Sequence, residues 1–265
     1  MITSASNERI KAIRKLRDRK YRETSSKYFI EGTRIVYEAM QAHQTIDSMV
    51  YSEDLMKNPV DRELIDLAEK SGIELIEVSK DVYLSISLKE GAQAISAVCH
   101  QNWKELDAVT EGGVWIGLLE VADPGNLGTI IRTADATGAK GIILIDHCTD
   151  PYDPSATRAS MGGIYSLSLV KTTTHQFIDS LTGRLPIIGT SDAASMDYHD
   201  VDYSQDMILL MGSERQGLSP QLKSACDLLV SIQMVGKCDS LNLAVSTGII
   251  LYEILNQHRN SVVRT

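Results

Sequence analysis

The sequence predicts an α/β protein with a C-terminal domain built on a mostly parallel sheet and a smaller N-terminal α/β domain. Three observations carry this prediction. The length of 265 residues exceeds one typical domain. From residue 114 onward, short apolar runs of strand length alternate with helix-like segments, which is typical of a parallel sheet with helices on both faces. A polar stretch with paired glycines precedes this region, so we expect domains at 1–100 and 114–265 with a linker at 101–113.

The N-terminal elements follow from local patterns. Residues 28–40 (YFIEGTRIVYEAM) predict a short strand, a turn at Gly32 and a helix. A second helix is expected in 61–72, ended by Gly72. Apolar or alternating runs predict further strands at 46–52, 73–79 and 94–100.

The C-terminal strands are expected in apolar runs of five to seven residues, at 114–120, 141–146, 166–170, 186–190, 207–211 and 228–232. Residues 126–140 contain a short helix that carries Arg132 among apolar neighbours. A largely apolar final helix is expected at 241–257, packed against the body of the domain.

Several classes of protein are disfavoured by composition. No apolar run approaches the ~18 residues of a membrane span, and the first residues lack the apolar core of a signal peptide. The four cysteines are scattered without a C-x-x-C pair, and the six histidines lack metal-ligand spacing. We therefore expect a cytoplasmic protein with reduced thiols, without a metal and without a membrane partner.

The charge distribution favours a nucleic-acid partner despite a net charge of -9. In residues 1–34, ten lysines and arginines stand against four acids, so this segment is +6 and the remainder is -15. A basic block of this kind is suited to a phosphate backbone, although a solvated helix face would look the same. Nearby aromatic residues could stack on bases or belong to the core. The candidate RNA-binding residues here are Arg14, Lys15, Arg17, Arg19, Lys20 and Arg22.

Three glycine-containing polar loops follow predicted strands, at 120–134 (EVADPGNLGTIIRTA), 211–220 (MGSERQGLSP) and 234–245 (MVGKCDSLNLAV). Ligands of parallel sheets bind beyond the carboxyl ends of the strands, and glycine lets the main chain approach them closely. The spacing Gly125-x-x-Gly128 is neither a dinucleotide fingerprint nor a P-loop. A small-molecule enzyme of the Rossmann class therefore remains only as an alternative.

Together, the three loops resemble the motifs of the SpoU (TrmH-like) RNA ribose 2'-O-methyltransferases of the SPOUT superfamily. The first motif, Asn-x-Gly-x-x-x-Arg-Thr-Ala, is matched by residues 126–134. The second, Gly-x-Glu-x-x-Gly-Leu, is matched by residues 212–218, and the third, Ser-Leu-Asn before an apolar helix, by residues 240–242. The likeness covers residues 114–258. The first hundred residues look like the L30-like substrate-binding domain of many members.

The resemblance implies a C-terminal domain with a deep trefoil knot, which its spacing alone does not predict because knots are nearly absent from proteins. It also implies a homodimer and the cofactor S-adenosylmethionine, bound largely through main-chain groups. By carry-over, the cofactor-binding positions are Gly212, Ile232 and Leu241, with Thr190 or Gly189 as weaker candidates.

The candidate catalytic residues are Arg132, Asn126, Glu214, Ser240 and Asn242. The family's equivalent of Arg132 is proposed as a general base, but an arginine side chain does not deprotonate in proteins. We expect Arg132 to clamp a phosphate and stabilise the alkoxide. For each of the other four residues, the sequence allows a structural role as well as a role in the active site.

Asn126 is either a helix N-cap or a hydrogen-bond partner of the arginine or the ribose, and Glu214 is expected to orient Arg132 or its dimer mate. Ser240 and Asn242 are expected to cap the final helix and to present polar groups as well. Arg158 is a further candidate for RNA contact.

The expected reaction is methyl transfer to a ribose 2'-hydroxyl of structured RNA, with large-subunit (23S) ribosomal RNA as the first candidate. Transfer RNA is the second, and a knotted RNA-binding protein without catalysis is a further alternative. That last alternative would predict a broken motif, whereas every polar motif position is present here.

Overall fold

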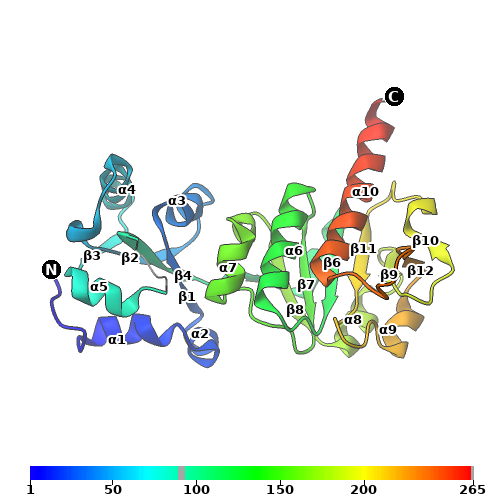
Figure 1. Cartoon of the computed structure of the whole chain (residues 1–265), viewed down its shortest axis with the longest axis horizontal. Coiled ribbons are helices and arrows are strands. Elements are labelled where there is room, and N and C mark those ends of the chain that lie inside the picture. The colour runs from blue at the N-terminus through cyan, green and yellow to red at the C-terminus, as the bar shows by residue number, and fades with distance from the viewer. Residues whose placement is uncertain (89–92, 264–265) are drawn as a thin grey trace. The chain divides into compact units, whose positions relative to one another are not determined.

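The computed structural model describes residues 1–88 and 93–263, which form two compact units (Figure 1). The first unit contains Met1–Gln101 together with Tyr152–Tyr165. The second contains Asn102–Pro151 and Ser166–Thr265. Each unit has its own sheet and its own core, so the chain is an α/β protein with two parts, as the sequence predicts.

The first unit is built on a mixed four-stranded sheet in the order β1-β4-β2-β3. β4 pairs antiparallel with both β1 and β2, whereas β2 and β3 are parallel. All four strands were expected from the apolar runs, and each begins or ends within two residues of the predicted bounds. The strands are β1 (Lys27–Glu31), β2 (Ile46–Tyr51), β3 (Glu74–Glu77) and β4 (Ile95–His100).

Helices of the first unit begin and end at recognisable signals. Asn58 forms a capping box with Asp61 at the start of α4, and Pro59 occupies the first helical turn. Gly72 follows the end of this helix with a φ of 73°, which confirms the predicted stop. The helices are α1 (Glu8–Lys15), α2 (Arg19–Ser25), α3 (Thr33–Gln41), η1 (Glu53–Leu55), α4 (Pro59–Lys70), α5 (Lys80–Ile86), α7 (Pro154–Ser160) and η3 (Gly163–Tyr165).

The last two of these elements come from the middle of the sequence, where the bounds predicted from sequence place them in the C-terminal domain. The chain leaves the second unit after Pro151 and packs Tyr152 against Tyr28 of β1, with ring centroids 4.6 Å apart. Both tyrosines are buried. A buried aromatic contact over such a sequence separation is invisible to local patterns, so residues 152–165 could not be assigned to the first unit from sequence.

The second unit is built on an eight-stranded sheet in the order β10-β12-β9-β11-β6-β7-β8-β5. All of its strand pairs are parallel, which confirms the predicted sheet type. The two-residue edge strands were not predicted, and one lies in the stretch we interpreted as a linker. The strands are β5 (Trp103–Lys104), β6 (Val114–Leu119), β7 (Gly141–Ile145), β8 (Ser168–Thr172), β9 (Ile187–Thr190), β10 (Met196–Asp197), β11 (Met207–Met211) and β12 (Leu228–Ser231).

Helices cover both faces of this sheet (Figure 1). On one face, Phe177 of α8 and Leu222 of α9 pack in one core with Ile143 and Ile145 of β7. The intervening strand residues, such as Ile142, are also buried and point to the other face, where α6 and α10 lie in contact with each other. The helices are η2 (Leu106–Glu111), α6 (Pro124–Ala136), α8 (Thr174–Leu181), η4 (Tyr198–Asp200), α9 (Pro220–Ala225) and α10 (Leu243–Val263).

The end of the chain returns across the sheet. β12 lies between β9 and the edge strand β10, and the segment after β12 leads to α10, which packs on α6. The close approach of these helices is seen at Gly248, where an added Cβ would lie 3.6 Å from the Thr133 methyl group. This return path is consistent with the trefoil knot that the family resemblance implies.

Candidate active site

The candidate site lies at the carboxyl edge of four neighbouring strands of the second unit. β12, β9, β11 and β6 are adjacent and parallel, so their carboxyl ends meet at one edge. The strand register places Thr190 beside Val230, and Leu210 beside Gly189. The loops that follow these strands contain all three sequence motifs, so the fold brings the motifs together where parallel sheets bind ligands.

The first motif loop leads into α6. Asp123 caps this helix, because its carboxylate accepts a hydrogen bond of 2.7 Å from the main-chain N–H of Asn126. Pro124 then occupies the first helical position. The N-cap interpretation of Asn126 was therefore wrong, since Asp123 performs that role. The Asn126 side chain is left to make other contacts.

Asn126 joins the other two motifs. Its amide Nδ2 donates to Glu214 Oε1 at 3.2 Å, and its Oδ1 accepts from Asn242 Nδ2 at 3.0 Å. These contacts span 88 and 116 residues of sequence. The side chains form a continuous chain of hydrogen bonds, which fixes the three loops relative to one another.

Asn242 also caps the last helix. Its Oδ1 accepts from the main-chain N–H groups of Ala244, at 2.9 Å, and Val245, at 3.3 Å. This confirms that Asn242 combines a cap with a polar contact at the site. Ser240 is exposed and makes no hydrogen bond with the residues that the structure describes, so the predicted capping role belongs to Asn242 alone.

Arg132 is exposed on α6 and points away from this chain of hydrogen bonds. It follows Asn126 by six residues, which turns its side chain by roughly 240° about the helix axis. Among the described residues it has no hydrogen-bond or ion-pair partner. Within one chain Glu214 does not orient Arg132, because it contacts Asn126 instead. That Glu214 orients the Arg132 of a dimer mate stays a prediction.

The second motif forms a tight turn after β11. Ser213 and Gly217 exchange main-chain hydrogen bonds of 3.2 and 3.0 Å, and Gly217 has a φ of 65°. Gly212 lies directly against this turn: a Cβ there would lie 2.2 Å from the Gly217 carbonyl carbon and 2.4 Å from the Leu218 nitrogen. Only glycine fits at position 212, and this close packing places Glu214 beside Asn126.

The third motif loop offers unused main-chain groups. Between residues 233 and 241, none of the main-chain N–H groups donates to a described residue. Ile232, at the start of this loop, is half-buried, and Leu241 near its end is 38 % exposed. Free amides beside an accessible apolar side chain suit a ligand that has both a polar and an aromatic part.

The remaining cofactor candidates differ in accessibility. Thr190 ends β9, and its hydroxyl donates to the Leu210 carbonyl at 3.4 Å. Gly189 is buried inside the sheet, where a Cβ would lie 2.5 Å from the Cys226 sulfur and 2.9 Å from a Leu218 methyl carbon. Gly189 is therefore needed for packing, and Thr190 is the member of the pair that reaches the carboxyl edge.

Most of the basic residues selected from the sequence lie on the surface of the first unit. Lys15 has its ammonium 5.6 Å from the Tyr21 ring centroid, and Arg19 pairs with Glu23 at 2.9 Å. Arg14 is half-buried and donates to Ser85 Oγ at 3.0 Å. The exposed members of the set are Lys15, Arg17, Arg19, Lys20 and Arg158.

Arg22 has to be removed from that set. Its side chain is 2 % exposed, and its guanidinium donates to two main-chain carbonyls, of Leu16 and Arg17, at 2.9 Å each. A buried guanidinium with these acceptors is not available to a phosphate. The physical reason for the error is that burial of a charged side chain depends on tertiary contacts that composition does not contain.

Two aspartates were overlooked in the sequence. Asp123 and Asp153 each precede a proline and cap the helix that follows, α6 and α7. The dipeptide Asp-Pro at a predicted helix start is a signal for an N-cap followed by the first helical residue, and it would have identified both.

Within residues 1–88 and 93–263, no helix is both long enough and apolar enough to cross a membrane. In the same ranges, no three histidine, cysteine, aspartate or glutamate side chains are grouped closely enough to hold a metal ion.

Two families match this chain. Residues 113–252 match the SpoU rRNA Methylase family, and residues 7–97 match the MRM3-like substrate binding domain. The first match covers every strand of the second unit's sheet except β5, together with the three motif loops, and the second covers most of the first unit.

Similar curated proteins include the 23S rRNA (guanosine(2553)-2'-O)-methyltransferase RlmP of Bacillus subtilis. It is 29 % identical over 96 % of this chain and 98 % of its own length. A 23S rRNA (uridine(2479)-2'-O)-methyltransferase of Streptomyces viridochromogenes is 31 % identical over 91 % of this chain and 87 % of its own.

Solved structures agree over nearly the whole chain. An S-adenosylmethionine-bound rRNA methyltransferase from Sinorhizobium meliloti is 34 % identical, with a TM-score of 0.88 over 96 % of this chain and 97 % of that one. The methyltransferase AviRb from Streptomyces viridochromogenes, in complex with S-adenosylmethionine, is 30 % identical with a TM-score of 0.88, covering 96 % and 98 % of the two chains. The fold, the three motif loops and these matches together show that this chain belongs to the SpoU rRNA methylase family.

Proposed function

We propose that this chain transfers a methyl group from S-adenosylmethionine to a ribose 2'-hydroxyl of 23S ribosomal RNA. The observation that carries the proposal is the hydrogen-bonded chain Glu214–Asn126–Asn242, which joins the three family motifs at one edge of the sheet. Full-length similarity to the two 23S rRNA methyltransferases supports the substrate class. We place the reaction in the cytoplasm.

The residues at the carboxyl edge fit the cofactor. The unpaired amides between residues 233 and 241 match the polar edge of adenine and a carboxylate, and the accessible Leu241 side chain matches an aromatic ring. The tight turn at Gly212 places a further stretch of main chain at the same edge. When bound, S-adenosylmethionine supplies an electrophilic methyl group on a sulfonium.

The protein's part in the reaction is alignment and electrostatics. Holding the hydroxyl in line with the methyl group can supply roughly 7–11 kcal/mol of the barrier. The hydroxyl gives up its proton to water as its oxygen bonds to the methyl carbon in place of the sulfur, and the negative charge that develops on this oxygen is stabilised by a fixed positive charge. Arg132 provides that charge and binds the adjacent phosphate through its planar fork of donors.

Arg132 acts across a homodimer in this proposal. It projects away from the Glu214–Asn126–Asn242 chain, and it has no partner among the described residues, so a second copy is needed to bring it to a complete site. The last helix offers a surface for such an association. Val245 is 51 % exposed, Tyr252 is 54 % exposed, and Ile249 lies half-buried between them. Positions four and three residues apart form one stripe on a helix.

We expect the double variant Val245→Glu, Tyr252→Glu to be a monomer with greatly reduced methyl transfer, because charges in an apolar interface are not compensated. Sedimentation measures the mass, and methyl transfer is assayed in parallel. Tyr37→Glu, at a tyrosine 47 % exposed on α3, is the matched control and should leave both unchanged. A monomeric wild-type protein with full activity would contradict the dimer.

The reaction itself is tested with labelled S-adenosylmethionine and separate samples of unmodified 23S rRNA and tRNA. We expect label only in 23S rRNA, at one ribose that becomes resistant to alkaline cleavage. Label in tRNA alone would replace the substrate, and binding of RNA without transfer would favour the catalytically silent alternative. Calorimetry with NAD tests the Rossmann alternative, which requires NAD to bind and S-adenosylmethionine not to bind.

A further inference from the structure

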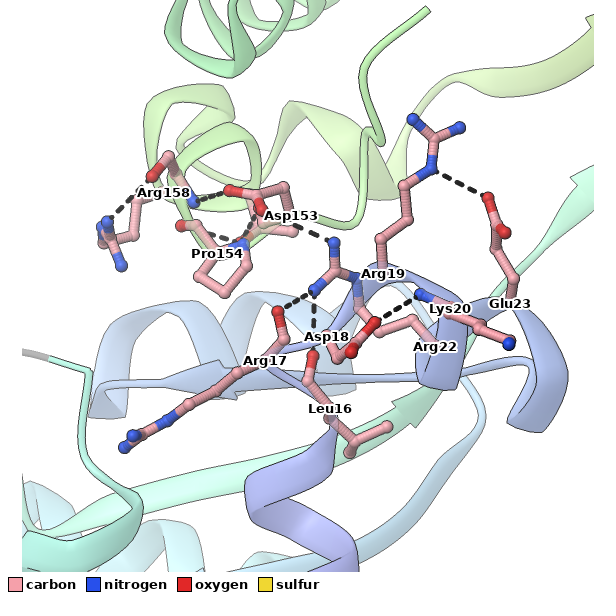
Figure 2. A network of polar contacts seen from close by, with 12 residues as sticks. Leu16, Arg17, Asp18, Arg19, Lys20, Arg22, Glu23, Asp153, Pro154 and Arg158 are labelled. Carbon is pink, nitrogen blue, oxygen red and sulfur yellow. Dashed lines mark hydrogen bonds and ion pairs between the residues drawn. The ribbon is translucent and has the colours of Figure 1, made fainter.

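Arg22 connects three elements of the first unit (Figure 2). It lies on α2, and its Nη1 donates to the carbonyls of Leu16 and Arg17, which follow the end of α1. Its Nη2 lies 3.5 Å from Asp153 Oδ2, at the start of α7. A buried guanidinium is stable only when its donors are satisfied, so its position depends on acceptors such as these.

The two carboxylate oxygens of Asp153 make different contacts. Oδ1 accepts from the main-chain N–H of Ser155 at 2.8 Å and caps α7, whereas Oδ2 faces Arg22. The same side chain therefore begins the helix and attaches it to α2. The contact spans 131 residues of sequence, and both partners belong to the first unit.

Arg158 lies on α7, the helix that Asp153 attaches to α2. Ala156, Thr157 and Ser160 are buried, and Arg158 is exposed with its Nη2 3.3 Å from Ser155 Oγ. Arg158 also lines a cavity of about 290 Å³ whose lining includes Arg34. A shift of α7 relative to α2 would therefore move Arg158, which is exposed and lines this cavity.

The same network holds a second exposed arginine. Arg17 lies between α1 and α2, and its carbonyl is one of the acceptors of Arg22. In Figure 2 the side chains of Arg17 and Arg158 extend to the same side of the network. The Arg17 guanidinium also donates to the carbonyls of Ser85, at 3.3 Å, and Ser87, at 2.8 Å. Arg22 therefore holds the main chain of Arg17 and the helix that carries Arg158, while these two carbonyls orient the Arg17 side chain.

We propose that Arg22 is a positioning residue for RNA recognition: its buried contacts fix Arg17 and Arg158 as one surface that binds RNA phosphates. The inference rests on the proposed function, since RNA is the ligand. Phosphate contacts set the register of a protein on a nucleic acid, so their spacing matters as well as their charge. Arg22 acts through Arg17 and Arg158 without touching the RNA.

Two variants break the network in different ways. Arg22→Met removes every donor of the guanidinium, whereas Asp153→Asn keeps an oxygen that can cap α7 and removes only the charge that faces Arg22. Arg62→Met is the matched control. It removes the same charge from the same unit and breaks an ion pair with Glu53 that has the same 3.5 Å distance, but Arg62 is 74 % exposed.

The experiment measures the affinity of the full-length protein for a 23S rRNA fragment as a function of salt. Each phosphate contact contributes about 0.7–0.9 to the slope of log K against log salt. We expect Arg158→Ala to lose about one contact, and Arg22→Met or Asp153→Asn to lose about two. Arg62→Met should keep the wild-type slope. The rate of methyl transfer at saturating RNA should be unchanged in the network variants, with the loss confined to KM.

A double-mutant cycle separates positioning from general stability. Arg158→Ala should weaken RNA binding by about tenfold in the wild type and by less than about twofold when Arg22→Met or Asp153→Asn is already present. Additive losses, or a wild-type salt slope in both network variants, would overturn the inference. Should Arg22→Met fail to fold, Asp153→Asn carries the same cycle. A wild-type protein that neither binds nor methylates the RNA would instead refute the proposed function.

Discussion

Replacing Arg132 by lysine is expected to reduce the rate of methyl transfer by about 10²–10³-fold, the size of effect seen when one donor to a developing oxyanion is removed. Lysine keeps the charge but presents it as a single point, so it cannot bind a phosphate with two parallel hydrogen bonds. Arg132 is exposed and has no described partner to lose, so the fold should not change. Single-turnover transfer at saturating S-adenosylmethionine measures the effect.

The controls for Arg132 separate chemistry from binding. The affinity for S-adenosylmethionine, measured by calorimetry, should be unchanged, because the cofactor candidates lie on other loops. Arg184→Lys, at an exposed arginine of the same unit, should keep full activity. If Arg132→Lys retains nearly the wild-type rate, a bidentate role is excluded. If Arg132→Ala is also active, the positive charge itself is not needed.

The strands of the second unit were predictable because their burial is complete. The stretches Gly141–Ile145 and Met207–Met211 are buried at every position, and continuous apolar runs of this length identify strands covered on both faces. The parallel arrangement followed from the intervening helices. The two-residue strands β5 and β10 escaped prediction, because so short a pairing is created by the neighbouring strand and leaves no periodic pattern.

The convergence of the motif loops was predictable from the sequence, whereas the direction of the Arg132 side chain differs from the expectation. That Asn126, Glu214 and Asn242 meet follows from parallel strands that end at one edge. The helical phase between Asn126 and Arg132 was available from their spacing of six residues, and it separates the two side chains. The first family motif contains both residues, so the resemblance suggested that their side chains lie together, although their spacing on the helix separates them.

The burial of Arg22 and the transfer of α7 to the first unit were beyond the sequence. Both depend on contacts between distant residues, among them the ion pair of Arg22 with Asp153 and the packing of Tyr152 on Tyr28, for which no local pattern exists. A basic segment predicts an exposed, charged surface, yet Arg22 of this segment is buried and links α2 to neighbouring elements. Asp153, by contrast, could have been recognised as a helix cap from the following proline, although its second partner could not.

Replacing Gly212 by alanine is expected to damage both the stability of the second unit and its site. The added Cβ would lie 2.2 Å from the Gly217 carbonyl carbon, a main-chain atom that cannot rotate away. Overpacking of this kind costs about 1–3 kcal/mol, and each kcal/mol lowers Tm by about 2–4 °C for a domain of this size. Thermal unfolding measures the loss.

The same substitution should disconnect the motifs, and this makes it more than a stability test. Relief of the clash requires the Ser213–Gly217 turn to open, which carries Glu214 away from its 3.2 Å contact with Asn126. Weaker binding of S-adenosylmethionine should therefore accompany the lower Tm. Gly248→Ala, on α10 of the same unit, is the matched control, since a Cβ there would meet only the Thr133 methyl group at an ordinary contact distance of 3.6 Å. A Gly212→Ala protein that melts and binds the cofactor like the wild type would show that the turn is not rigid, and the hydrogen-bonded chain would then no longer account for how the three loops are held.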